Sequence, residues 1–191
     1  DALPISFAVT AYRSVGIAAR QVYTPRWAHC DDNHAWVEVF VDGEWHFLGA
    51  CEPEEVLDTG WFSGPANRAI LIHTRNFSDY VKESNEEYLG KEGALYYFNH
   101  TDFYGRTKLV KILVKDEKGK PAAGAHVVVE ILNMAEFFPA AAVIADADGE
   151  VQMTLGLGDI RVRAFDGIRR AEAMMRIEEE DSLELVLREE A

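Results

Sequence analysis

The 191-residue sequence predicts an α+β fold in its first half and an all-β sandwich in its second half. The first half opens with apolar residues at helical spacing and continues with segments in which apolar and polar residues alternate, which indicates a helix followed by strands. The second half is a series of short alternating segments separated by Gly and Asp turns, a pattern typical of a sandwich of about seven strands. Because domains cluster near ~100 to 150 residues, we expect two of them, residues 1–106 and residues 107–191.

An amphipathic helix is expected from Ile5 to Val15. Apolar residues recur there with helical spacing, and Gly16 occupies the position of a helix C-cap. A short strand is expected over residues 18–23, because a Thr-Pro breaker follows it. The chain opens without Met and enters this helix at once, so we expect it to be a piece of a longer protein.

A β-hairpin is the clearest element of the first half. From His34 to Val41 the alternation is strict, and Asp42-Gly43 is the favoured two-residue hairpin turn. Such a turn aligns the two strands symmetrically about itself, which places Cys51 opposite His34 with their Cβ atoms ~5 Å apart. One face of the first strand then carries four side chains: His34, Trp36, Glu38 and Phe40.

Residues 53–106 are expected to form irregular connections. Their periodicity is weak, and Gly and Pro interrupt it at several positions. One further strand is expected over residues 69–74. The alternating segments of the predicted sandwich begin at residue 107.

The charge of the chain limits the class of partner. The formal net charge is −14, whereas a nucleic-acid backbone or an anionic membrane surface requires clustered Lys and Arg. We therefore expect neither partner. No apolar run approaches the ~20 residues that cross a bilayer, so no membrane insertion is expected within this chain.

Neither a metal site nor a cofactor is predicted. The chain has two cysteines, Cys30 and Cys51, too few for a disulfide scaffold and without a zinc-binding spacing. The polar loop at residues 29–34 matches no recognised ligand spacing, which favours a solvated loop over a metal site. At Asp146, an Asx turn is favoured over a calcium site.

The first segment of the chain resembles the core of the transglutaminase-like superfamily, the papain-like fold that transglutaminases share with many bacterial cysteine peptidases. Three features carry the resemblance: a helix ending in Gly-Ile-x-Ala-Arg at residues 16–20, a strand beginning His-Ala-Trp-Val-Glu at residues 34–38, and a Gly-x-Trp hairpin return at residues 43–45. Together they cover about residues 1–75. The resemblance implies a papain-like α+β domain and acyl transfer through a thioester, ending on water or on an amine.

In that family a cysteine at the start of the helix is the nucleophile, a histidine on the hairpin takes the thiol proton, and an aspartate orients the imidazole. His34 matches the family's histidine and is the candidate catalytic residue. The family's spacing gives Asp1 for the nucleophile and Gly49 for the aspartate. The resemblance therefore assigns one residue of three.

Two other residues are candidates for the unassigned roles. Cys51 is a candidate relocated thiol because it is predicted to face His34, although a helix N-terminus that would lower its pKa is not expected there. Glu38 is a candidate partner for the imidazole, ~6.5 Å along the strand, with a salt bridge to Arg20 or Arg26 as the alternative. Two aromatic residues are candidates for lining a substrate groove, with burial in the core as the alternative: Trp27 and Trp36.

The second half resembles the carboxypeptidase-regulatory-like or Cna-B-like β-sandwiches, small immunoglobulin-like domains common in bacterial surface proteins. The pattern V-x-D-x-x-G-K-P-x-x-G-A-x-V-x-V at residues 114–129 and the D-x-D-G-E turn at residues 146–150 carry this resemblance. Such domains are usually spacers or adhesive modules, which implies the same for this half.

Three functions are compatible with these observations. The first is a catalytically degenerate transglutaminase-like domain of a larger bacterial extracytoplasmic or cell-surface protein, which binds a peptide or peptidoglycan-type amide. The second is a working cysteine peptidase or transamidase whose nucleophile lies upstream of residue 1. The third is a structural or adhesive surface module. The sequence does not predict the oligomeric state.

Overall fold

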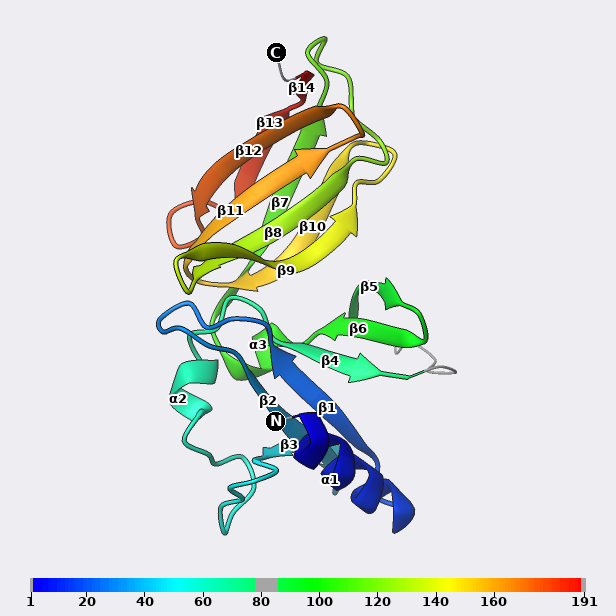
Figure 1. Cartoon of the computed structure of the whole chain (residues 1–191), viewed down its shortest axis with the longest axis vertical. Helices are drawn as coiled ribbons and strands as arrows, with labels where there is room; N and C mark the ends of the chain where they lie inside the picture. The colour runs from blue at the N-terminus through cyan, green and yellow to red at the C-terminus, as the bar shows by residue number, and fades with distance from the viewer. Residues whose placement is uncertain (1, 78–85, 190–191) are drawn as a thin grey trace.

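The computed structural model describes residues 2–77 and 86–189. These residues form three helices and fourteen strands, and the strands are arranged in three sheets (Figure 1). The predicted papain-like α+β core followed by a C-terminal domain is therefore wrong, because the molecule is mostly β. The helices are too few and too short for an α+β core. Helix α1 (Ala2–Ser14) has 13 residues, whereas α2 (Ser63–Ala66) and α3 (Thr101–Tyr104) have four each.

The first sheet has six strands in the order β3-β2-β1-β4-β6-β5, and every pairing in it is antiparallel. Its strands are β1 (Ala19–Thr24), β2 (His34–Val41), β3 (Glu44–Leu48), β4 (His73–Asn76), β5 (Glu87–Glu92) and β6 (Leu95–Asn99).

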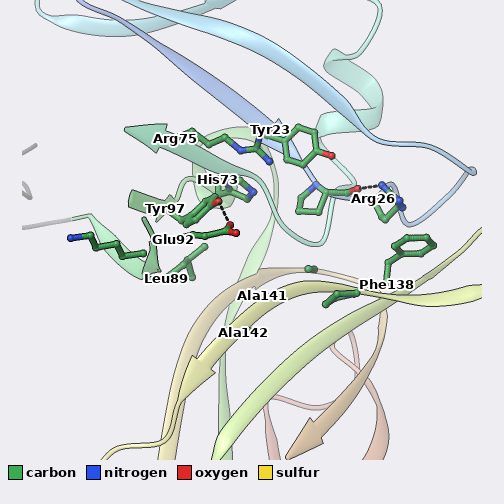
Figure 2. A pocket seen from close by; sticks show the side chains of 15 residues that line it. Tyr23, Arg26, His73, Arg75, Leu89, Glu92, Tyr97, Phe138, Ala141 and Ala142 are labelled. Atoms are coloured by element: carbon green, nitrogen blue, oxygen red, sulfur yellow. Dashed lines mark hydrogen bonds between the residues drawn. The ribbon is translucent and has the colours of Figure 1, made fainter. Parts of the chain in front are cut away.

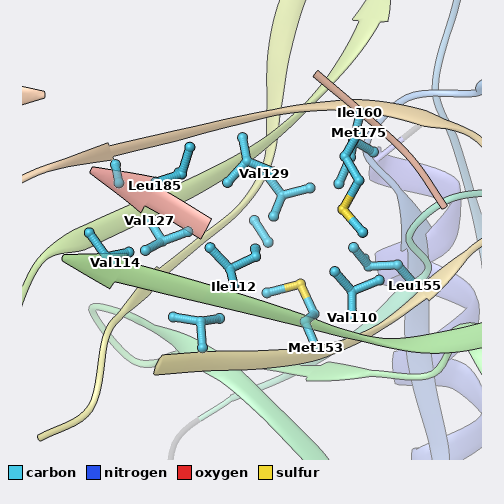
Figure 3. Close-up of a cluster of buried hydrophobic side chains, with 14 of the residues drawn as sticks. Val110, Ile112, Val114, Val127, Val129, Met153, Leu155, Ile160, Met175 and Leu185 are labelled. Atoms are coloured by element: carbon cyan, nitrogen blue, oxygen red, sulfur yellow. The ribbon is translucent and has the colours of Figure 1, made fainter. Parts of the chain in front are cut away.

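The second half forms a β-sandwich, as its alternating segments predict, from a three-stranded sheet in the order β10-β7-β13 and a five-stranded sheet in the order β14-β12-β11-β8-β9. The core between the two sheets is built from apolar residues that include Val110, Ile112, Met153 and Met175 (Figure 3). The strands are β7 (Thr107–Lys115), β8 (His126–Asn133), β9 (Glu136–Ile144), β10 (Glu150–Gly156), β11 (Asp159–Phe165), β12 (Arg169–Arg176), β13 (Ser182–Val186) and β14 (Arg188–Glu189).

The expected helix and the first strand are confirmed by α1 and β1. Gly16 follows α1 with a φ of +86°, the left-handed conformation of a helix C-terminus. The odd-numbered face of β2 packs on the helix, where Val37 and Val39 join Ile5 in one apolar cluster. The helix therefore covers one face of β2 and leaves the face of Trp36 to a different cluster.

The predicted hairpin is also confirmed. Asp42 and Gly43 have φ values of +54° and +91°, as a two-residue turn of this kind requires. The register follows the symmetrical alignment, but pairing ends at Val37 and Leu48. The expected cross-strand pair of His34 and Cys51 is therefore wrong, because the chain turns away after β3 and leaves the ladder.

The prediction for residues 53–106 missed part of the sheet. The expected strand at 69–74 is shifted to β4 (His73–Asn76), and the β5–β6 hairpin was not predicted. A register shift between Tyr88 and Gly90 interrupts the pairing of this hairpin. Such an irregularity weakens the alternation by which a strand is identified.

The six-stranded sheet and the sandwich meet through a continuous apolar and hydrogen-bonded contact. Ile70, Leu71 and Leu89 belong to the same buried cluster as the sandwich core. The backbone N–H of Gly156 donates to the carbonyl oxygen of Ile70 at 2.9 Å. The two regions thus share one core, and a domain boundary near residue 106 stays a prediction.

Candidate functional site

His34 begins β2 and lies among four aromatic rings. Its ring centroid is 4.7 Å from Trp61, 5.0 Å from Phe62, 5.8 Å from Trp36 and 6.2 Å from Trp27. The side chain is half-buried, and its Nε2 is buried without a hydrogen-bond partner among residues 2–77 and 86–189. The imidazole is therefore held by packing against rings.

The surroundings of His34 favour the neutral imidazole. Burial lowers the pKa of His34, and the charges of Glu52 and Asp32 oppose this effect without overcoming it. A neutral imidazole presents one N–H donor and one acceptor nitrogen. The ring can therefore accept a proton or a hydrogen bond from a group beside it.

A cavity of about 420 Å³ lies beside His34. Trp27 and Trp61 line it, and so do both thiols of the chain, Cys30 and Cys51, which are free and exposed. Three carboxylates also border it: Asp31, Asp32 and Glu52. The cavity thus combines aromatic walls with an acidic rim.

The candidate thiol and the two unassigned positions do not complete the triad of the family. Cys51 borders the same cavity as His34, although it lies outside the β2–β3 ladder. Asp1, the position assigned to the nucleophile, lies outside the described residues. Gly49, the position assigned to the aspartate, is buried, and a Cβ atom there would lie 2.8 Å from the carbonyl oxygen of Glu52. The backbone leaves no room for a side chain at that position.

Glu38 is fully buried and forms an ion pair with Arg20, whose Nε lies 2.7 Å from the Glu38 Oε2. His100 Nε2 lies 3.2 Å from the other carboxylate oxygen, to which the hydroxyl of Tyr104 also donates. Burial opposes ionisation of Glu38, but the contacts with His100, Arg20 and Tyr104 outweigh it and lower its pKa. Of the two alternatives, the salt bridge to Arg20 is the one observed.

This buried network also holds one of the candidate aromatic residues. The Trp36 Nε1 donates to the hydroxyl of Tyr104 at 2.7 Å, and Trp36 is fully buried. Burial and the charge of Glu38 raise the pKa of Tyr104. Trp36 is therefore a core residue, whereas Trp27 is buried and borders the His34 cavity; its role in binding stays a prediction.

Sequence reasoning missed His100 and Tyr104. Both lie more than 60 residues along the chain from Glu38, in a stretch expected to be irregular, and Tyr104 reaches the network from the four-residue helix α3. The sequence carries one local signal for them, the cluster of aromatic residues at 96–104. That cluster alone does not identify their buried partner.

Hydrogen bonds with Asn133, in strand β8 of the sandwich, hold the loop at residues 29–34 in place. The side-chain amide of Asn133 donates to the carbonyl oxygens of Trp27 at 2.9 Å and Cys30 at 2.8 Å, and its Oδ1 accepts from the backbone N–H of Asp32 at 3.2 Å. Three hydrogen bonds to one buried side chain fix this wall of the His34 cavity.

No group of three or more His, Cys, Asp or Glu side chains is placed to hold a metal ion within the described ranges. Asp146 forms the expected Asx turn, in which its Oδ1 accepts from the backbone N–H groups of Asp148 and Glu150 at 2.9 Å. Among the described helices, none has both the length and the apolar character needed to span a membrane.

Comparison with known proteins supports the resemblance of the hairpin region. Residues 5–50 match the transglutaminase-like superfamily. The match runs from residue 5, within α1, through β1, β2 and β3, and includes His34 but not Cys51. A search of curated proteins finds no match to the chain.

Among solved structures, a streptococcal ancillary pilin is similar in part. It shares 11% sequence identity with the chain at a TM-score of 0.35, over 97% of this chain and 66% of the pilin chain. The chain thus spans about two thirds of the length of that pilin. A similarity of this size carries no conclusion about the function of the chain.

Proposed function

We propose that the chain is a structural module of a surface protein, in which the transglutaminase-like segment contributes fold and not acyl-transfer chemistry. The closure of the backbone over Gly49 is the observation that carries this proposal. In the family's arrangement an aspartate at that position would orient the imidazole, and here the Glu52 carbonyl oxygen would lie 2.8 Å from its Cβ. This close approach supports a hairpin return that does not carry the family's acid.

The contacts of Glu38 support the same proposal. Its carboxylate is engaged by Arg20, His100 and Tyr104 in a buried network. These partners hold the carboxylate in the core, and none of its contacts within residues 2–77 and 86–189 is with His34, which supports a structural role for Glu38 in the sheet.

The junction between the sheet and the sandwich is a further support. Ile70 and Leu71 lie in the sandwich core, and Asn133 binds the loop at residues 29–34. Domains move relative to one another unless their contact is large and apolar. A shared core suits a rigid spacer, and the surface location rests on the resemblance of residues 114–129 to the sandwiches of bacterial surface proteins.

Acyl transfer tests the proposal directly. The chain is incubated with a glutamine-containing peptide and a labelled primary amine, and incorporation of the amine is compared between the wild-type protein and His34→Ala. We expect no difference between the two. Turnover that disappears in His34→Ala would contradict the structural proposal.

Unfolding tests the rigid junction. Gly156 has no space for a side chain, because a Cβ atom would lie 1.9 Å from the Ala69 carbonyl oxygen. We expect Gly156→Ala to lower the free energy of unfolding by about 3 kcal/mol within one cooperative transition. Gly64→Ala is the matched control, since nothing lies within 4 Å of its added Cβ. Two separate transitions in the wild-type protein would contradict a rigid module.

A second candidate function is binding of a peptide or peptidoglycan-type amide in the cavity beside His34. The buried Nε2 of His34, which has no partner in the described part of the chain, favours it, since a neutral imidazole can form one hydrogen bond with an amide. Titration with a muramyl dipeptide, followed by tryptophan fluorescence, should give saturable binding that His34→Ala removes and His126→Ala retains. Equal responses in both variants would exclude this binding.

A further inference from the structure

A second cavity, of about 450 Å³, lies between the six-stranded sheet and strand β9 of the sandwich. Figure 2 shows Tyr23, Arg75 and Tyr97 on the side of the sheet, with Phe138 and Ala141 on the side of the sandwich. Its volume lies within the ~300 to 1,000 Å³ typical of small-molecule sites. It is distinct from the cavity beside His34, with which it shares no lining residue.

The side chains that line this cavity carry a net positive charge, whereas the net charge of the whole chain is negative. Three cationic side chains line it, those of Arg26, Arg75 and Lys91, together with one carboxylate, that of Glu92. Glu92 accepts a hydrogen bond from the Tyr97 hydroxyl at 3.1 Å. In a chain of net charge −14, a cavity with an excess of cations favours a negatively charged occupant.

Three side-chain nitrogen atoms of residues that line this cavity lack a hydrogen-bond partner in the described part of the chain. The Nε atoms of Arg26 and Arg75 and the Nδ1 of His73 are buried and have no hydrogen-bond partner within residues 2–77 and 86–189. His73 is only 5% exposed. A buried polar atom without a partner is costly, and the three residues that carry these atoms all line one cavity.

Aromatic rings hold both guanidinium groups in place. The Arg75 guanidinium carbon lies 4.0 Å from the centroid of the Tyr23 ring, and that of Arg26 lies 3.8 Å from the centroid of the Phe138 ring. A guanidinium that stacks on a ring by its face keeps the N–H groups of its edge for hydrogen bonds. The Nη1 of Arg26 donates to the carbonyl oxygen of Pro25 at 2.8 Å. The remaining N–H groups of the two arginines match the oxygen atoms of a carboxylate or phosphate.

We propose that this cavity binds a small molecule that carries a carboxylate or phosphate group on an apolar body. Arg75 and Arg26 pair with the oxyanion, and the apolar body lies against Leu89 and the alanine-rich stretch of β9 at residues 140–142. The proposal is independent of the function proposed above, since a spacer can carry a ligand site at its junction.

His73 contributes to this site as a neutral group. Burial, followed by the charge of Arg75, lowers the pKa of His73 to about 3. The imidazole therefore stays uncharged at neutral pH and offers a hydrogen bond. The positive charge that attracts the oxyanion comes from the arginines and Lys91.

Isothermal titration calorimetry of the whole chain tests the proposal, with benzoate in one arm and inorganic phosphate in the other. We expect saturable binding of at least one probe below about 10 mM, a range typical of weak small-ligand sites. Binding of benzoate alone identifies a carboxylate ligand, and binding of phosphate alone or of both probes identifies an oxyanion site that accepts phosphate.

Charge variants then test whether the probe binds at the arginines of this cavity. Arg75→Gln and Arg26→Gln should each weaken the bound probe at least tenfold, and Arg188→Gln is the matched control because it removes the same charge from exposed strand β14. The proposal is overturned if neither probe saturates. It is also overturned if Arg188→Gln weakens binding as much as Arg75→Gln, or if Arg75→Gln binds like the wild-type protein while retaining its cooperative unfolding transition.

Discussion

The cavity beside His34 and the cavity beside Arg75 each border a histidine whose buried nitrogen has no hydrogen-bond partner among the described residues, but they differ in what surrounds that histidine. His34 lies among aromatic rings with carboxylates at the rim, whereas His73 lies beside arginines that have no carboxylate partner in the described part of the chain. The first cavity is marked by a family motif, and the second by no motif. A recognisable sequence motif and a cluster of polar groups without hydrogen-bond partners can thus lie in different places of one fold.

The largest effect is expected from Glu38→Ala, which tests whether the acid on the His34 strand serves the sheet or the imidazole. Loss of this carboxylate removes the partner of the buried Arg20 Nε and leaves Arg20 paired with Glu86 in the described part of the chain. The free energy of unfolding should fall by about 3 kcal/mol, the lower end of the range for breaking a buried ion pair. Chemical denaturation measures this change. The titration of His34, followed by NMR, should stay the same; a shift of its pKa would show that Glu38 acts on it.

The pH dependence of stability should separate the two histidines. The pKa of His73 is lowered from 6.5 to about 3 in the folded chain, so the unfolded chain binds the proton more readily between these values. The stability that His73 contributes is therefore present above about pH 6.5 and is lost as the pH falls toward 3.

Denaturation between about pH 5.5 and 6.5 measures the onset of this loss, since ordinary carboxylates remain largely ionised there. His73→Gln should reduce the slope of stability against pH in this window more than His34→Gln does, because His34 is only half-buried. If the two variants have equal slopes, burial does not distinguish the two sites.

A smaller effect is expected from Asn133→Ala, which loosens one cavity and leaves the other intact. Three hydrogen bonds to the loop at residues 29–34 are lost, at a cost of about 1–3 kcal/mol. Hydrogen exchange should rise in this loop, beside His34. Binding of benzoate or phosphate at Arg75 should be unchanged, and a parallel loss there would mean that the two cavities are coupled.

The sequence predicted those elements whose patterns are local. The apolar spacing of α1, the alternation of β2 and the Asp-Gly turn at residues 42–43 each depend on neighbours along the chain, and each is confirmed. The predicted α+β class failed because residues 53–106 were expected to form irregular connections and one strand of a papain-like domain. Those residues instead contribute β4, β5 and β6, whose short and irregular pairings leave little periodicity.

The sites were less predictable because they depend on contacts between distant segments. Glu38 meets Tyr104 and His100 only after the six-stranded sheet has formed. The second cavity is lined by Arg26, Arg75 and Phe138, which come from the loop after β1, from β4 and from β9. The match to the family, in contrast, follows from one continuous segment, residues 5–50.

The most direct test of the central claim, that the hairpin of His34 is structural, is the rate at which iodoacetamide labels Cys51, measured by mass spectrometry of the resulting peptides. A thiolate activated by the imidazole would react faster than an ordinary exposed thiol. The account predicts that Cys51 and Cys30 are labelled at similar rates and that His34→Ala leaves both rates unchanged. Rapid labelling of Cys51 that slows at least tenfold in His34→Ala would contradict it.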